Sequence, residues 1–386
     1  MIVNRLALTD FRNYASAELD LFVGANLFVG SNGQGKTNLV EALGYLSTLG
    51  SHRVSTDHAL IRQGRDAAIV RANLEHDERR MLVEVQLNRS SPNRAQVNRS
   101  AIKVRELPRY FSSVLFAPED LALVRGDPAG RRRFLDELLV LRNPRFSAVF
   151  ADYDRVLRQR NTLLKSARAA SVKAGQLSTL DIWDERLVTL GSEIIVARSE
   201  LVTLLTPEVQ QAYVSVAGAD HHALMSSLLS IDSADLDDAE ASVASTAPIP
   251  AAAVEEMFRG VLARVRRNEL DRGITLVGPH RDDLVLELNG MPARGYASHG
   301  ESWSLALSLK LASAALLKRD SALGDPVLIL DDVFAELDES RRSRLAQAVE
   351  LFDQVLITAA VFAEVPEELT GHTVHIAAGQ IVQERP

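Results

Sequence analysis

The chain has 386 residues, which is more than one hydrophobic core usually serves, so its length predicts two domains or lobes. Apolar residues make up 46% of the chain and charged residues 24%, a balance typical of a soluble globular protein. The absence of cysteine excludes a disulfide framework and a thiolate metal site, and we expect a cytoplasmic protein. The net charge of −8 argues against indiscriminate nucleic-acid binding, so any contact with DNA requires a local basic face.

The N-terminal segment predicts two half-buried strands, because residues 2–9 and 15–21 alternate apolar and polar side chains. It lacks the apolar core of a signal peptide, and no apolar run approaches the ~18 residues that span a bilayer, so we expect no membrane association. The turn Phe11-Arg12-Asn13-Tyr14 lies between the strands. Its aromatic rings can pack under a sheet, or the turn can bring Arg12 beside a nucleotide.

The segment from Gly30 to Thr37 fits the phosphate-binding pattern G-x-x-x-x-G-K-[ST]. A short predicted strand at 25–29 precedes it, and apolar residues at helical spacing follow it up to Gly50. This order favours a P-loop over a glycine-rich turn that ends in Lys-Thr by chance. Because the glycines let backbone N–H groups approach a triphosphate, we predict that Lys36 reaches the β- and γ-phosphates of ATP and that Thr37 ligates Mg²⁺.

The turn Ser51-His52-Arg53 after this helix has two interpretations. It can be a surface turn, or Arg53 can neutralise charge at the triphosphate. Residues 67–75, 80–87 and 95–104 then predict an antiparallel meander. A further strand from Ser113 to Phe116 precedes a helix that Asp127 can cap.

The pattern from Pro144 onward is helical. Apolar residues repeat at alternating steps of four and three in two stripes, the first from Phe146 to Ala167 and the second from Trp183 to Leu204. Arg160 occupies one position of the first stripe. Since a polar stretch at 168–180 separates the stripes, we predict an antiparallel helical hairpin. The segment from Asp232 to Ala253 predicts a linker, and a helix follows at Val254–Leu270.

Two further motifs lie beyond this helical region. The segment from Gly278 to Asp283 precedes strands predicted at 284–288 and 293–297, and its role stays open. Ser298 and Gly300 stand at the start of a strongly apolar helix. Ser298 can be a plain N-cap, or the two residues can form a second anion site that serves a neighbouring subunit.

A run of four apolar residues, from Val327 to Leu330, predicts a strand that is buried on both faces of a parallel sheet. Asp331 and Asp332 follow at its C-terminal end, where α/β sheets bind ligands. We predict that Asp331 binds Mg²⁺ opposite Thr37 and that Asp332 orients or deprotonates the attacking water. Asp338 then predicts the cap of a helix at residues 339–351, and a buried strand follows at 354–358.

The order of P-loop, helical insertion, Ser-x-Gly-Glu, Walker B strand and Glu-Leu-Asp resembles the ABC-type ATPase heads of SMC and Rad50 proteins. Only 295 positions separate Lys36 from Asp331 (331 − 36), which leaves room for a short helical lobe and no long coiled coil. This compact form is similar to the RecF family of bacterial recombination mediators. The matching segments are 10–14, 116–120, 126–136, 278–283 and 331–338.

The resemblance implies an α/β fold. An ABC-type P-loop ATPase head, a mixed sheet with flanking helices, would span residues 1–110 and 285–386. A mainly α-helical lobe would be inserted at 111–284. Three positions depart from the wider cassette pattern. Asp332 replaces the usual glutamate, Thr358 stands near the usual switch histidine, and Glu119 or Asp120 replaces the expected glutamine.

The resemblance also implies residue roles. Lys36, Asp331 and Asp332 would be catalytic, and Thr37 and Asp331 would hold Mg²⁺. Ser298 and Gly300 would reach the γ-phosphate of the partner subunit, and Asp338 would lie in the loop that crosses this interface. The implied nucleotide-binding residues are Arg12, Gly30, Ser31, Asn32, Gly33, Gln34, Gly35, Lys36, Thr37, Asn38, Ser298, Gly300 and Asp338.

The function implied by the resemblance is ATP-dependent DNA binding in recombinational repair, DNA replication and the SOS response. An ATP-induced homodimer would recognise gapped, single-stranded or single-strand/double-strand junction DNA and help RecR and RecO to load RecA, with weak, DNA-stimulated ATP hydrolysis. Six arginines are candidates for the DNA-binding face, although any one of them can instead belong to a solvated helix face: Arg131, Arg132, Arg133, Arg264, Arg266 and Arg267. Two alternatives are a non-catalytic adaptor gated by ATP and a transporter-type ABC subunit.

Overall fold

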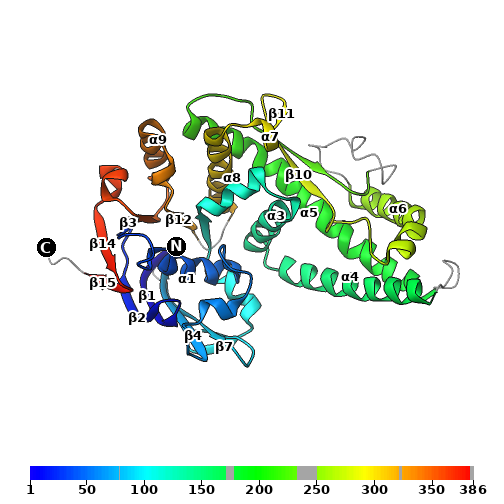
Figure 1. Cartoon of the computed structure of the whole chain (residues 1–386), viewed down its shortest axis with the longest axis horizontal. Helices are drawn as coiled ribbons and strands as arrows, with labels where there is room; N and C mark the ends of the chain where they lie inside the picture. The colour runs from blue at the N-terminus through cyan, green and yellow to red at the C-terminus, as the bar shows by residue number, and fades with distance from the viewer. Residues whose placement is uncertain (78, 171–177, 233–249, 321–323, 383–386) are drawn as a thin grey trace. The chain divides into compact units, whose positions relative to one another are not determined.

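The computed structural model describes residues 1–77, 79–170, 178–232, 250–320 and 324–382 (Figure 1). The chain divides into two compact units. The ATPase lobe comprises residues 1–124, 208–221 and 297–386, and the helical lobe comprises residues 125–207 and 222–296. Most of the predicted linker, Glu78 in a predicted turn, and part of the polar stretch at 168–180 lie outside the described residues.

This division differs from the predicted lobes at three places. Residues 111–124 belong to the ATPase lobe, because the strand that they contain extends its parallel sheet. Residues 285–296 belong to the helical lobe, because their strand pairs with a strand of that lobe. The end of the longest helix, residues 208–217, belongs to the ATPase lobe although the helix begins in the other lobe.

The ATPase lobe contains a six-stranded, mainly parallel sheet in the order β15-β14-β3-β13-β12-β8. Its strands are β3 (Gly24–Val29), β8 (Ser113–Phe116), β12 (Val327–Asp331), β13 (Gln354–Ala359), β14 (His372–Ala377) and β15 (Gln380–Val382). Only β15 runs antiparallel to its neighbour. The register pairs Asp331 at the end of β12 with Thr358 on β13, which confirms the buried strand that the apolar run from Val327 predicted.

A second sheet in this lobe is antiparallel, in the order β2-β1-β4-β5-β6-β7. Its strands are β1 (Ile2–Phe11), β2 (Tyr14–Asp20), β4 (Ala67–His76), β5 (Arg79–Asn88), β6 (Arg94–Val97) and β7 (Ser100–Ile102). The predicted strand at 95–104 is therefore a hairpin. Its turn residues, Asn98 and Arg99, have positive φ angles of 49° and 66°, as a tight hairpin turn requires.

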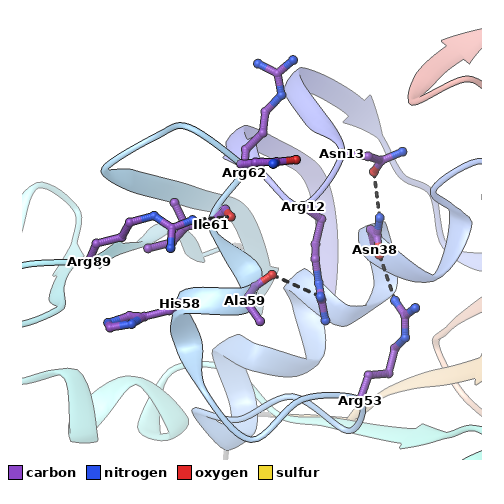
Figure 2. Close-up of a pocket in the computed structure, with 10 residues that line it drawn as sticks. Arg12, Asn13, Asn38, Arg53, His58, Ala59, Ile61, Arg62 and Arg89 are labelled. Atoms are coloured by element: carbon purple, nitrogen blue, oxygen red, sulfur yellow. Dashed lines mark hydrogen bonds between the residues drawn. The ribbon is translucent and has the colours of Figure 1, made fainter.

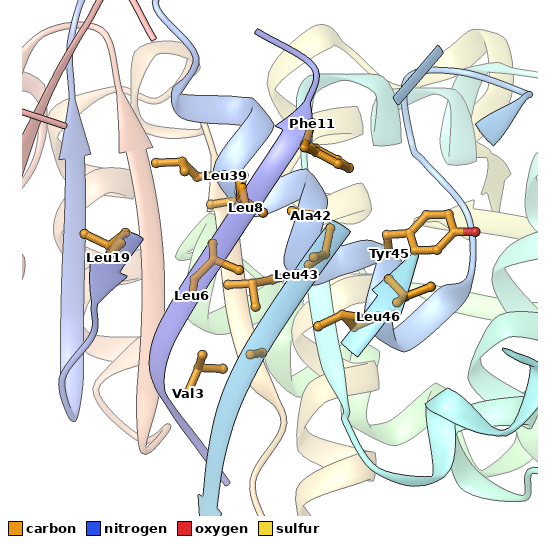
Figure 3. Close-up of a cluster of buried hydrophobic side chains, with 14 of the residues drawn as sticks. Val3, Leu6, Leu8, Phe11, Leu19, Leu39, Ala42, Leu43, Tyr45 and Leu46 are labelled. Carbon is orange, nitrogen blue, oxygen red and sulfur yellow. The ribbon is translucent and has the colours of Figure 1, made fainter. Parts of the chain in front are cut away.

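The helix α1 (Lys36–Thr48) packs in the core between these sheets (Figure 3). Leu39, Leu43 and Leu46 on α1 share one buried cluster with Leu6 and Leu8 of β1 and with residues of the parallel sheet. Most residues of α1 are buried, so the helix is apolar around nearly its whole circumference. This packing fixes the helix whose first residue is the P-loop lysine.

The remaining helices of the ATPase lobe are α2 (Ala122–Arg125), α8 (His299–Asp320) and α9 (Glu339–Val349). Short 3-10 turns are η1 (Asp57–Leu60), η2 (Val104–Arg109), η3 (Pro118–Leu121), η5 (Phe334–Glu336), η6 (Phe362–Glu364) and η7 (Glu367–Leu369). None of the helices in the described parts of the chain combines the length and the apolarity needed to cross a membrane.

The helical lobe contains α3 (Pro128–Arg142), α4 (Phe146–Ala169), α6 (Ala251–Arg272) and the first part of α5 (Ser178–Ala217). A small sheet joins β9 (Leu224–Leu228), β10 (Asp283–Leu288) and β11 (Met291–Pro292). Residues 293–297 were predicted as a strand, but they contain the short helical turn α7 (Ala293–Tyr296), since Gly295 at a φ of 92° redirects the chain.

The predicted helical hairpin is confirmed in α4 and α5. Leu164 and Ala167 of α4 pack against Leu180 of α5, and Arg145 near the start of α4 pairs with Glu193. This order of contacts is antiparallel. The second stripe drifts across α5, so that Leu204 is exposed and Leu205 is buried. A straight α-helix has 3.6 residues per turn, and a repeat of 3.5 therefore rotates around it.

Arg160, the polar residue in the first stripe, is completely buried. Its guanidinium donates to Asp184 Oδ1 at 2.7 Å, to Glu269 Oε2 at 2.6 Å and to Thr275 Oγ1 at 2.8 Å. These partners come from α5, from α6 and from the segment after α6. The arginine therefore ties three parts of the helical lobe together through one buried charge.

The motif from Gly278 to Asp283 is a second junction within the helical lobe. The Asp282 carboxylate accepts from the backbone N–H and the hydroxyl of Ser230, both at 2.8 Å, and burial raises its pKa to about 6. His280 bonds Tyr153 on α4 at 2.8 Å, and Arg131 on α3 pairs with Asp283 at 2.7 Å. The motif has a packing role in this lobe.

We predict that Glu269→Ala lowers the free energy of unfolding of the helical lobe by about 3–5 kcal/mol, because it leaves the buried Arg160 guanidinium without its closest carboxylate. Chemical denaturation measures the change. Glu185→Ala is the matched control, because it breaks an exposed pair of the same lobe, between Glu185 of α5 and Arg259 of α6, and should alter stability little. Equal effects of the two substitutions would contradict the structural role of Arg160.

Candidate nucleotide-binding site

The loop between β3 and α1 has a backbone path that only glycine accommodates at two points. Gly35 has a φ of 117°, and a Cβ there would lie 2.8 Å from Asn13 Nδ2 and from Tyr14 Oη. A Cβ at Gly30 would lie 2.2 Å from the backbone oxygen of Ile376 on β14. The two glycines let the loop fold tightly against β14 and the β1–β2 turn.

The loop wraps around the side chain of Lys36. Its ammonium donates to the backbone oxygens of Gly30 at 2.5 Å and Ser31 at 3.2 Å. Burial lowers the pKa of Lys36, and the nearby charges of Asp332 and Asp331 act in the opposite direction. The structure thus holds a cation at the centre of the loop.

The Asp331 carboxylate connects three elements of the site. Its Oδ1 atom accepts a hydrogen bond from the Thr37 hydroxyl of α1 at 3.0 Å and another from the Thr358 hydroxyl of β13 at 2.5 Å. Asp331 and Thr358 are both buried. The P-loop and Walker B residues, 294 positions apart in the chain, therefore form one oxygen-rich centre.

Asp332 adopts a conformation that few non-glycine residues use, with a φ of 55°. Its backbone N–H donates to the Thr358 hydroxyl at 2.9 Å and lies 3.2 Å from the Thr358 backbone oxygen. Its Oδ1 atom is buried and has no hydrogen-bond partner among the described residues. A carboxylate oxygen held in this way can accept a proton or a hydrogen bond from a bound molecule.

A pocket of about 340 Å³ lies over these groups. Eight predicted site residues line it, namely Asn32, Gly33, Gly35, Lys36, Thr37, Asn38, Asp331 and Asp332. Gly30 and Ser31 instead hold the lysine, and the Gln34 side chain accepts from the backbone N–H of Ala378 at 2.5 Å. Gln34 therefore anchors the loop to the β14–β15 turn.

Glu119 and Asp120, the two candidates for the missing glutamine, have different environments. Glu119 lines the P-loop pocket. Asp120 accepts from the backbone N–H of Ala117 at 2.9 Å and pairs with Lys310 at 3.0 Å. Of the two carboxylates, Glu119 is the one in a position to face a ligand.

Arg12 lines a neighbouring pocket of about 760 Å³ rather than the P-loop pocket (Figure 2). Its guanidinium donates twice to Glu41 of α1, at 2.8 and 2.6 Å, and once to the backbone oxygen of Ala59 at 3.1 Å. Asn38 and Arg53 line both pockets. Figure 2 shows the chain of hydrogen bonds that joins Asn13, Asn38 and Arg53 at this boundary.

Ser298, Gly300 and Asp338 lie together at the starts of α8 and α9. Ser298 and Glu301 cap each other's backbone N–H groups, at 2.8 and 3.3 Å, and Asp338 accepts from the backbone N–H of Arg341 at 2.9 Å. A Cβ at Gly300 would lie 2.9 Å from the Arg341 guanidinium. Within the described part of the chain, the lining of the P-loop pocket includes none of the three.

Sequence reasoning missed several residues of the site. Glu41 is fully buried and accepts from Arg12 and from the Ser51 hydroxyl, the latter at 2.5 Å. The sequence could have identified Glu41, because it is the only charged residue between Thr37 and the end of α1. Asn13 bonds the Gln34 backbone oxygen and Asn38, and His52 lies 3.6 Å from Asp331. No spacing rule marked these two.

Three of the six candidate DNA-binding arginines are engaged inside the helical lobe. Arg131 is buried against Asp283, Arg132 donates to the Asp282 backbone oxygen at 2.7 Å, and Arg266 binds Asp181 and Asp184. Each of the three is therefore held by partners of its own lobe. Arg133, Arg264 and Arg267 are exposed.

The residues of the P-loop pocket fit a Mg²⁺ ion that a nucleotide brings. Mg²⁺ prefers oxygen ligands and usually takes one or two from the protein and the rest from phosphate and water. Thr37 and Asp331 supply two such oxygens 3.0 Å apart. In the part of the chain that the structure describes, no group of three or more His, Cys, Asp or Glu side chains could hold a metal by itself.

Comparison with known proteins agrees with this geometry. The family model for the RecF/RecN/SMC N-terminal domain matches residues 2–373. The chain is 65% identical to the DNA replication and repair protein RecF of Clavibacter sepedonicus, over 99% of this chain and 95% of that protein. It is 63% identical to the protein of the same name from Leifsonia xyli subsp. xyli, over 99% and 100% of the two chains.

Solved structures extend the comparison to the fold. A structure described as the recombination mediator protein RecF-ATP in the RecFOR pathway superimposes with a TM-score of 0.86, at 27% identity over 99% of this chain and 97% of that one. An Smc head bound to the C-winged helix domain of ScpA gives a TM-score of 0.53 at 14% identity, over 99% and 97% of the two chains, a likeness of fold alone. The chain therefore belongs to the RecF family, and it has the α/β fold of an ABC-type ATPase head with an inserted helical lobe.

Proposed function

We propose that this chain is an ATP-dependent DNA-binding protein of recombinational repair. The observation that carries the proposal is the joining of Lys36, Thr37, Asp331 and Asp332 around one pocket. The names of the relatives, which describe replication and repair proteins and a RecF-ATP structure, support the same function.

The triphosphate of ATP would occupy the P-loop pocket, with Lys36 at its phosphates. Thr37 and Asp331 would hold Mg²⁺, which supplies charge neutralisation at the phosphates when bound. The rest of the nucleotide would extend toward the Arg12 pocket, because Asn38 and Arg53 line both cavities. Arg53 then lies where it can neutralise phosphate charge.

Hydrolysis would use Asp332 as the group that orients the attacking water. Its unpartnered, buried Oδ1 atom supports this role. An aspartate is one methylene shorter than the glutamate of most cassette ATPases, and this difference favours slow turnover. We propose weak ATPase activity that DNA stimulates.

Dimerisation would complete the site. Ser298 and Gly300 lie at the N-terminus of α8, the end at which the helix dipole attracts anions. They lie outside the P-loop pocket of their own chain, which supports a role toward the γ-phosphate bound by a second copy. Asp338 at the start of α9 would lie in the loop that crosses this interface.

The closed dimer would recognise gapped, single-stranded or junction DNA and assist RecA loading with RecO and RecR. A second candidate is a non-catalytic adaptor that uses ATP only as an interface ligand, and the short side chain of Asp332 favours it. Comparing ATP-driven dimerisation with ATP turnover separates the two.

We predict that Lys36→Ala abolishes ATP binding and ATP-dependent DNA retention together, because the loop loses its only central cation. Equilibrium binding of ATP and of gapped DNA at physiological salt measures both losses. Lys103→Ala, an exposed lysine of the same lobe, is the control. Full DNA affinity in the Lys36 variant would contradict ATP gating.

We predict that Ser298→Arg leaves ATP binding intact but prevents ATP-dependent dimers, because a bulky cation at the start of α8 obstructs the interface. Sedimentation velocity with and without ATP measures the oligomeric state. Ser166→Arg, at an exposed position of α4, is the control. Normal dimers in the Ser298 variant would refute the assignment across the interface.

We predict that replacing the exposed Arg264 and Arg267 with alanine weakens DNA binding equally for all sequences. Each lost phosphate contact should reduce the slope of log K against log salt by about 1. Salt titration of binding to gapped, single-stranded and blunt duplex DNA measures the slope. Arg259→Ala, which removes an arginine paired with Glu185, is the control. An unchanged slope would place the DNA-binding face elsewhere.

A further inference from the structure

His52 lies beside the oxygen of Asp331 that the two threonines do not contact. Thr37 and Thr358 both donate to Asp331 Oδ1, whereas His52 Nε2 lies 3.6 Å from Oδ2. A small rotation of either side chain would shorten that separation to a hydrogen bond. The histidine comes from the turn after α1, so it approaches the carboxylate from a different element than either threonine.

The turn that carries His52 is held in place by its neighbour. The Ser51 hydroxyl accepts from the backbone N–H groups of Arg53 and Val54 at 2.9 and 3.1 Å and donates to Glu41 Oε1 at 2.5 Å. Glu41 is in turn bound by the guanidinium of Arg12. The hydrogen bonds of Ser51 to the buried Glu41 and to the backbone that follows His52 therefore fix the turn from which the imidazole faces Asp331.

The ring nitrogen nearest Asp331 has no other use in the described structure. His52 Nε2 is buried and has no hydrogen-bond partner among the described residues. Buried polar atoms in folded proteins are nearly always paired, so an unpaired one beside a candidate metal ligand requires an explanation. Residues that hydrogen-bond a metal ligand orient it and typically change metal affinity 10- to 100-fold when they are replaced.

We propose that His52 is a positioning residue that holds the Oδ2 atom of Asp331 while nucleotide and Mg²⁺ bind. This inference rests on the proposed Mg²⁺–ATP site. Thr37 and Thr358 fix one oxygen of the carboxylate and His52 fixes the other, so that the plane of the carboxylate is set from two sides. Without the imidazole, His52 no longer restrains Oδ2. The carboxylate can then rotate in the directions that the hydrogen bonds of the threonines to Oδ1 do not restrain.

The test measures binding of a fluorescent ATP analogue, N-methylanthraniloyl-ATP, to the full chain in EDTA and across a Mg²⁺ titration. His52→Leu keeps the volume of the side chain and removes the nitrogen. We expect its affinity in EDTA to stay within about twofold of wild type and its Mg²⁺ midpoint to rise at least about tenfold. His52→Gln, which retains an N–H donor at the position of Nε2, should recover most of that shift.

The controls distinguish a positioning role from a structural one. His76→Leu replaces the last residue of β4 in the same lobe and should leave the Mg²⁺ midpoint unchanged. An unchanged midpoint in His52→Leu, or an equal loss of affinity with and without Mg²⁺, overturns the proposal.

Asp331→Asn is measured in parallel. If it loses the Mg²⁺ dependence while the His52 variants keep it, only this inference fails, whereas a Mg²⁺ dependence retained in Asp331→Asn refutes the proposed metal site itself.

Discussion

The hydrogen bonds to the Asp331 carboxylate are the constraint on which the rest of the site depends. One oxygen accepts from Thr37 at the start of α1 and from Thr358 on β13, while the carboxylate itself ends β12. A shift of any of these three elements would break at least one hydrogen bond of the buried Asp331 carboxylate. The relative position of P-loop and Walker B strand is thus set by buried polar contacts, which are costly to leave unmade.

The packing of α1 supports these contacts. The helix is buried around most of its surface and is packed between the mainly parallel sheet and the antiparallel sheet. Close packing on every side fixes its rotation and its position along its axis, which in turn aims Lys36 and Thr37. Glu41, the one charged residue of α1 after Thr37, pairs with Arg12 and accepts a hydrogen bond from Ser51, which ties the turn that carries His52 and Arg53 to the helix.

The helical lobe is organised by buried charge rather than by a seam of apolar residues alone. Arg160 occupies a position where the heptad pattern calls for an apolar residue, and it bonds three partners that the sequence places far apart. The motif from Gly278 to Asp283 works in a similar way through Asp282, His280 and Arg131. Such networks select one arrangement of the helices, because any other leaves a charge unpaired.

The features that depend on local pattern can be predicted from the amino-acid sequence. The P-loop, the Walker B strand, the helical hairpin and the cap of α9 by Asp338 all follow from residue types at fixed spacing, and each is present. The same patterns placed Lys36, Thr37, Asp331 and Asp332 around a common pocket before any contact between them was known.

The residues from distant segments that complete the site, and the boundary between the lobes, could not be predicted in this way, because they depend on how the folded segments pack. Thr358, Glu41, Asn13 and His52 act through contacts with residues that no spacing rule connects to them. The ion pair with Asp283 shows that Arg131, a candidate surface cation, is buried within the helical lobe. The spacing of residues along the chain predicts which face of a helix or strand a residue occupies. Which residue it contacts on that face depends on how segments that are distant in the sequence pack together.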